Sequence, residues 1–93
     1  AEKLYQTGIL YIKMEEFESA KIAFNEAINT YYDTDIIHKL YQGLIITLSK
    51  NLEVEKAYEI LKKHESSLKQ FNLYSDALSS IDIGKGKLKK GEK

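Results

Sequence analysis

The sequence predicts an all-α fold made of two antiparallel helix hairpins and a C-terminal capping helix. Three observations support this prediction: apolar residues recur at helical spacing, proline is absent, and the pattern of the first half repeats in the second. Without proline, helices run uninterrupted until Gly, Ser, Asn or Asp breaks them. We expect a helical domain over residues 1–83, without strands, and a lysine-rich flexible tail over residues 84–93.

The first hairpin is predicted to comprise helices over residues 2–14 and 17–31. The first of these carries a wide apolar arc that includes Gly8, whereas the second carries one narrow stripe that begins at Phe17 and ends at Tyr31. The polar residues 13–16 leave room only for a tight turn. The two helices must therefore lie antiparallel.

The second hairpin is predicted to comprise helices over residues 35–49 and 53–65. Asp33 or Thr34 can cap the first of them, and residues 49–51 end it. A capping helix is expected over residues 67–82, because Ser67 and Gln70 have the spacing of a capping box and Gly84 suits the C-terminal cap.

The charge distribution separates the tail from the rest of the chain. Net charge is zero, but the last ten residues hold five lysines and one glutamate, about +4, which leaves about −4 on residues 1–83. A mildly acidic body is a poor candidate for nucleic-acid binding. Two interpretations of the tail stay open: attraction to anionic lipids or an acidic partner, or a solubilising, unstructured terminus, which we favour.

No catalytic, metal or cofactor site is predicted. Cysteine is absent, and Glu15 and Glu16 are adjacent carboxylates that point apart. His38 and His64 fall in different helices without a second ligand at helical spacing. Residues 84–87 read Gly-Lys-Gly-Lys but lack the spacing of a phosphate-binding loop. We therefore expect a protein that is not an enzyme.

The repeated unit resembles the tetratricopeptide (TPR) pattern of W-x2-L-G-x2-Y followed by A-x3-F. The matching positions in the first unit are Leu4, Thr7, Gly8, Tyr11, Ala20, Phe24 and Ala27, with Tyr32 where the pattern has proline. In the second unit Gly43 follows Gly8 by 35 residues, and Ala57 follows Ala20 by 37. The expected fold is thus two TPR-like hairpins of an α-α superhelix, with Gly8 and Ala20 at close helix contacts.

This resemblance implies a scaffold that binds other proteins. In such scaffolds the first helix of each pair lines an inner surface. The corresponding residues here form an apolar, concave-face candidate for partner binding: Tyr5, Ile9, Ile12, Ile37, Leu40, Leu44 and Leu48. The alternative is that helix packing buries them, since wide apolar arcs usually mean burial.

Residues 5–65 resemble the C-terminal repeats of the BamD-type lipoproteins of the outer-membrane β-barrel assembly (BAM) machine. The resemblance rests on the linkers at residues 31–34 and 52–57. It implies a scaffold on the periplasmic side of the outer membrane, held by an N-terminal lipid anchor absent from this chain. The implied partner is an outer-membrane β-barrel assembly protein, and a homo-oligomer is an option.

Three alternatives remain open at this point. The first is a Tol-Pal system coordinator with similar linkers. The second is a cytoplasmic TPR cochaperone, although only Lys13 and Lys39 are available to grip a C-terminal carboxylate. The third, from another class, is a lipid or nucleic-acid binder that acts through residues 85–93.

Overall fold

The computed structural model describes residues 2–91, and every regular element within that range is an α-helix. This confirms the all-α prediction for the described residues. In chain order the helices are α1 (Glu2–Lys13), α2 (Phe17–Tyr31), α3 (Ile37–Lys50), α4 (Val54–Lys63), α5 (Glu65–Gln70) and α6 (Tyr74–Gly91).

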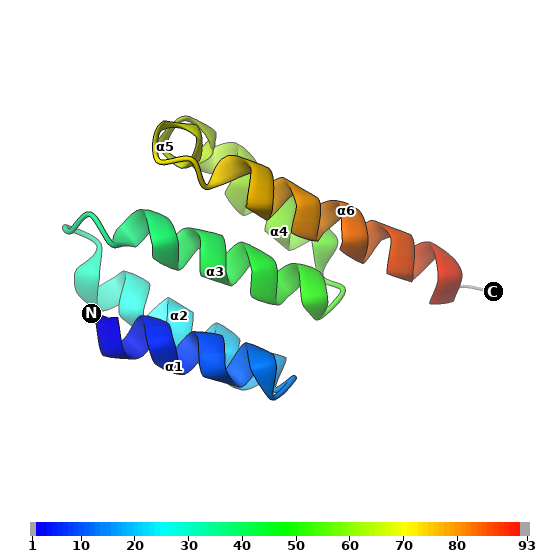
Figure 1. Ribbon diagram of the computed structural model, residues 1–93, viewed down its shortest axis with the longest axis horizontal. Coiled ribbons are helices and arrows are strands. Elements are labelled where there is room, and N and C mark those ends of the chain that lie inside the picture. The colour runs from blue at the N-terminus through cyan, green and yellow to red at the C-terminus, as the bar shows by residue number, and fades with distance from the viewer. Residues whose placement is uncertain (1, 92–93) are drawn as a thin grey trace.

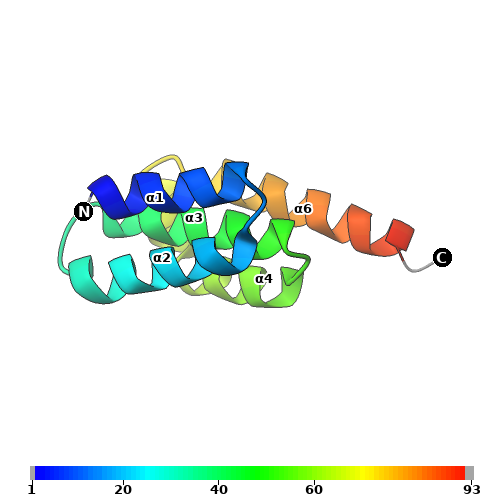
Figure 2. The same cartoon turned by 90° about the horizontal axis from the view of Figure 1, so that it is seen from below.

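The helices form two layers, and α3 is at the centre. Helices α1, α3 and α6 lie side by side in one layer, and α2 and α4 lie behind them (Figures 1 and 2). Helix α2 runs antiparallel to α1, and α4 runs antiparallel to α3 (Figure 1). Helix α3 contacts all five other helices, so little of its surface is left open.

The core is built around the ring of Phe24, which is completely buried. A Cβ atom placed on Gly8 of α1 or on Gly43 of α3 would lie 2.5–2.8 Å from atoms of that ring. The two glycines therefore let α1 and α3 close over Phe24 from two sides. The rest of the core comes from every helix except α1, and its buried residues are Ala20, Ala27, Ile37, Leu40, Leu44, Ile45, Leu48, Ala57, Leu61, Leu68, Ala77 and Ile81.

Three helices, α1, α3 and α5, each end in a turn of the same type. Glu15, Leu52 and Asn72 each have a positive φ, between 61° and 65°. In each turn the amide of the next residue donates to a carbonyl five residues back: Glu16 to Tyr11, Glu53 to Leu48 and Leu73 to Leu68, at 2.8–2.9 Å. This is the Schellman pattern of helix termination. The turns at residues 15 and 52 occupy equivalent places in the two hairpins.

The predicted single capping helix over residues 67–82 is wrong. Helix α4 ends at Lys63, the short helix α5 follows at once, and the break before α6 falls at Asn72. Ser67 lies inside α5 and forms no capping box, since α5 begins without a side-chain cap. Serine side chains on an exposed helix surface do not by themselves end a helix.

The prediction that Gly84 ends the last helix is also wrong, because α6 continues to Gly91. Gly84 is buried, and a Cβ atom there would lie 2.8 Å from the Ser49 carbonyl oxygen and from Val54. This glycine therefore serves close helix packing rather than capping. Residues 84–91 of the predicted unstructured tail are helical, and residues 92 and 93 lie outside the described range.

Candidate binding groove

The inner surface predicted from the sequence divides into two parts. Its four α3 residues, Ile37, Leu40, Leu44 and Leu48, are between 0% and 8% exposed and belong to the core. They do not form the open inner face expected from the sequence, because α3 packs against five other helices, and only Leu44 and Leu48 reach the floor of a groove. The side of α3 that faces outward carries Lys39, Ile46 and Lys50 instead.

The three α1 residues of that set are half-buried. Tyr5 approaches Phe24 edge-on, with ring centroids 6.2 Å apart, and the Lys39 ammonium nitrogen lies 5.5 Å from the centroid of the Tyr5 ring. Ile9 and Ile12 pack against the core while keeping part of their surface accessible. These residues therefore link α1 to the core and also leave a small apolar area on its surface.

A groove of about 500 Å³ runs between α2 and α4. Because both helices pack on α3, side chains of α3 form its floor, and these are Leu44 and Leu48, 5% and 4% exposed. Ile22 of α2 and Ile60 of α4 stand on the walls. The remaining lining residues are polar or charged: Glu18, Lys21, Asn25, Glu53, Lys56 and Glu59.

Sequence reasoning missed Ile22, which is 67% exposed. It falls outside the stripe that packs α2 on the core, and an isolated exposed apolar residue carries no signal by itself. Its meaning comes from its position over the groove.

An ion-pair network holds one end of the groove. The Lys21 ammonium nitrogen lies 2.7 Å from a carboxylate oxygen of Glu53 and 3.1 Å from one of Glu18. The Asn51 amide donates to Glu53 at 2.6 Å, and Lys56 lies 3.3 Å from its other oxygen. The hydrogen bond from Lys21, and after it the one from Asn51, lowers the pKa of Glu53 to about 2. The hydrogen bond with Glu53 in turn raises the pKa of Lys21.

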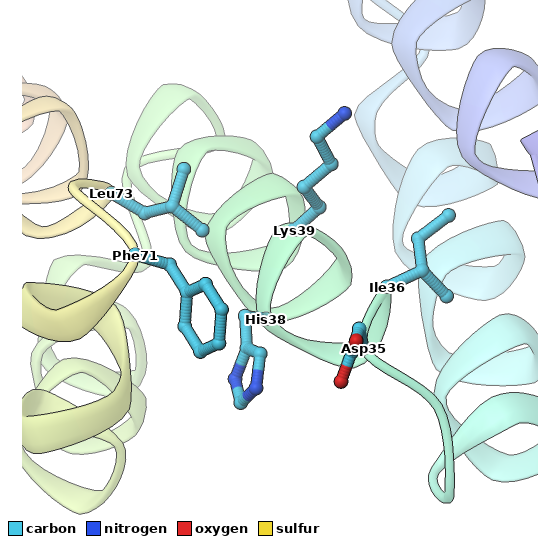
Figure 3. Close-up of a pocket in the computed structure, with 6 residues that line it drawn as sticks. All are labelled: Asp35, Ile36, His38, Lys39, Phe71 and Leu73. Carbon is cyan, nitrogen blue, oxygen red and sulfur yellow. The ribbon is translucent and has the colours of Figure 1, made fainter.

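A second hollow, of about 350 Å³, lies where the first turn of α3 meets the α5–α6 turn. Figure 3 shows the rings of His38 and Phe71 face to face there, with centroids 4.3 Å apart. Ile36 and Leu73 add apolar surface, and Asp35 and Lys39 contribute one charge of each sign. This arrangement fits an apolar side chain better than a reacting group.

Both histidines singled out in the sequence are engaged in packing. His64 stacks on Tyr41 with centroids 3.7 Å apart. Burial lowers the pKa of His64, and the charges of Lys63 and His38 lower it further. Across residues 2–91, no three His, Cys, Asp or Glu side chains come close enough together to hold a metal ion.

None of the helices described for residues 2–91 is long and apolar enough to span a bilayer. Comparison with known proteins returned no match among family models, curated proteins or solved structures.

Proposed function

We propose that this domain binds another protein, and that the groove between α2 and α4 receives an apolar side chain of that partner. The observation that carries the proposal is Ile22, which is 67% exposed above a floor of Leu44 and Leu48. An apolar centre surrounded by polar residues is the usual anatomy of a protein interface. Burying the exposed part of Ile22 would favour binding, because isoleucine is among the most hydrophobic side chains.

The charges around the groove support a partner with both acidic and basic residues. Glu18 and Glu59 are exposed carboxylates, and Lys56 is an exposed ammonium group at the same rim. Such rim charges contribute to orientation and association rate more than to affinity. The apolar centre then supplies most of the binding energy.

The TPR interpretation is part of this proposal. Two hairpins that end their first helices in the same Schellman turn, at Glu15 and Leu52, support a structural repeat. The packing of Phe24 against Gly8 and Gly43 supports it too, because these three residues match positions of the repeated pattern. Stacked hairpins of this kind offer extended binding surfaces.

Within this class we propose a scaffold of the outer-membrane β-barrel assembly machinery, with a barrel-assembly protein as the partner. Support comes from the resemblance of residues 31–34 and 52–57 to linkers of BamD-type lipoproteins. A direct test is binding of the purified domain to the periplasmic region of such an assembly protein. Failure to bind it, together with binding to a Tol-Pal component or a cytoplasmic chaperone, would favour the other adaptors.

The groove itself is tested without knowing the partner. Peptides selected from a displayed random library are titrated into the isotope-labelled domain, and amide shifts are mapped onto the structure. Ile22→Asp should weaken the selected peptides by about 2 kcal/mol or more if Ile22 is central to the contact. Leu10→Asp is the matched control, since Leu10 is 56% exposed on α1 and is not part of the groove.

Ile9→Asp distinguishes the groove from the accessible part of α1. Weaker binding by Ile9→Asp, with normal binding by Ile22→Asp, would move the site to α1. Equal effects of Ile22→Asp and Leu10→Asp would count against any specific site at the groove.

A further inference from the structure

The C-terminal end of α6 projects beyond the rest of the molecule. Figures 1 and 2 show the C-terminal end of α6 extending past the α3–α4 turn. Lys85, Lys87 and Lys89 are all exposed on the last two turns of α6, where Lys85 lies beside α4 and Lys87 beside the end of α3. A helical projection presents its charges at fixed spacing, whereas an unstructured terminus does not.

The charge of the projection is opposite to that of the body. Residues 84–93 hold about +4 and residues 1–83 about −4, so charge is unevenly distributed along the sequence although the net charge is zero. Lys50, at the end of α3, lines one small hollow together with Lys87, while the carboxylates Glu55 and Glu59 line another together with Lys85. An anionic surface would attract the lysines of this segment, and the neighbouring carboxylates weaken that attraction.

Apolar side chains accompany the lysines. Ile83 is 61% exposed one turn before Lys87, and Leu52, 41% exposed, borders a hollow together with the half-buried Leu88. Ile83 and Lys87 are four residues apart on one face of α6, so an apolar and a basic side chain can reach a membrane surface together.

The type and placement of the cations favour binding to a surface with many negative charges over binding of one anion in a defined geometry. The chain contains no arginine, so none of its cations has the fork geometry that recognises one phosphate or carboxylate in bidentate fashion. Lys85 and Lys87 lie about 160° apart around the helix axis, given about 100° per residue. Lys85 also lies over the Tyr58 ring, at 5.6 Å from its centroid.

We propose that the C-terminal end of α6 binds the surface of membranes that contain anionic phospholipids. The lysines supply the electrostatic attraction, and Ile83 enters the headgroup region. This interaction is independent of the groove between α2 and α4, so the domain can hold a protein partner and a membrane surface at once.

The test is partition of the full chain between buffer and vesicles of phosphatidylcholine, alone or mixed with phosphatidylglycerol. Binding should require the anionic lipid and fall steeply with salt. Replacing Lys85, Lys87 and Lys89 by Gln should lower the partition coefficient by about two orders of magnitude at low salt. Ile83→Ser should lower it by several-fold.

The matched control replaces Lys3, Lys62 and Lys63 by Gln, which changes net charge equally on exposed positions away from the α6 end. It should keep binding within a few-fold, and Ile22→Asp should leave vesicle binding unchanged. Circular dichroism checks that all variants stay folded. An equal loss in the control, no binding of the natural chain to anionic vesicles, or equally tight binding to soluble polyglutamate would each overturn the proposal.

Discussion

The ammonium nitrogen of Lys21 on α2 lies 2.7 Å from a carboxylate oxygen of Glu53, the residue that immediately precedes α4. The pair joins the two hairpins across one end of the groove between α2 and α4. Both side chains are only about one-fifth exposed, at 19% and 22%. Partial burial weakens the screening by water, so this pair contributes more than an ordinary surface ion pair.

The pair gives stability a defined dependence on acidity. The pKa of Glu53 falls from 4.5 to about 2 in the folded protein. A carboxyl with a depressed folded pKa stabilises the fold fully above its unfolded pKa, and this stability disappears as pH falls from about 4.5 through about 2. We expect a loss of about 1–2 kcal/mol in the free energy of unfolding across that range from Glu53, after allowance for solvent screening.

Urea unfolding at several pH values measures this loss. Glu53→Gln should reduce stability at neutral pH and flatten the profile between pH 4.5 and 2, because the titrating group is gone. Glu55→Gln, two residues further along at an exposed position, is the control and should keep the natural slope. Identical slopes for the natural chain and Glu53→Gln would show that the pair does not govern the acid sensitivity.

The glycines around Phe24 should resist even a methyl group. Gly8→Ala and Gly43→Ala both place a Cβ atom within 2.5–2.8 Å of ring atoms of Phe24, and the ring is held between α1 and α3. We expect a loss of about 1–3 kcal/mol from overpacking, larger than the gain of about 1 kcal/mol from helix propensity. Thermal unfolding followed by circular dichroism measures the net effect.

Gly86→Ala is the matched control for these two variants. A Cβ atom at Gly86 has no neighbour within 4 Å, and the residue lies inside α6. The same substitution should therefore stabilise the helix slightly, by up to about 1 kcal/mol. A gain in melting temperature for Gly8→Ala or Gly43→Ala would show that the core is looser than the structure indicates.

The sequence was most informative where apolar spacing and packing agree. The first two helices are within one residue of their predicted bounds, since the stripe from Phe17 to Tyr31 and the short polar segment before it leave few alternatives. The importance of Gly8 at a close contact was also predictable from the repeated pattern. These features depend on local periodicity, which a single sequence displays directly.

The errors arose where the same residue type serves two purposes. Gly84 looks like a helix cap in the sequence but is a close contact with Ser49 in the structure. The true breaks at Leu52 and Asn72 carry no glycine, so the usual signal for a Schellman turn was missing. The groove could not be predicted, because the position of Ile22 over Leu44 depends on how α2 and α4 pack on α3.

Replacing a residue of left-handed backbone conformation at a helix end by glycine should raise the stability of the domain. Glu15 has a φ of 61°, a conformation that costs a residue with a Cβ atom roughly 1 kcal/mol relative to glycine. Glu15→Gly should therefore stabilise the domain by up to about 1 kcal/mol. Glu26→Gly, the same change inside α2, should instead destabilise by about 1 kcal/mol. Chemical denaturation of both variants checks the predicted opposite signs.

Leu44 and Ile22 lie in the same groove but should respond very differently to a carboxylate. Leu44 is 5% exposed and packs in the core, so Leu44→Asp would bury a charge without a partner and should cost at least about 3 kcal/mol, enough to threaten folding. Ile22 is 67% exposed, and Ile22→Asp should change stability by less than about 1 kcal/mol.

Leu44→Ala keeps this comparison measurable if the aspartate variant does not fold. It should lower the free energy of unfolding by about 2–4 kcal/mol, because deleting a buried side chain leaves a cavity. Urea unfolding of Leu44→Ala, Ile22→Ala and Ile22→Asp measures the change in the free energy of unfolding for each variant. A small cost for Leu44→Ala would show that the groove floor is open to solvent, and a large cost for Ile22→Asp would assign that residue to the core instead of to a binding surface.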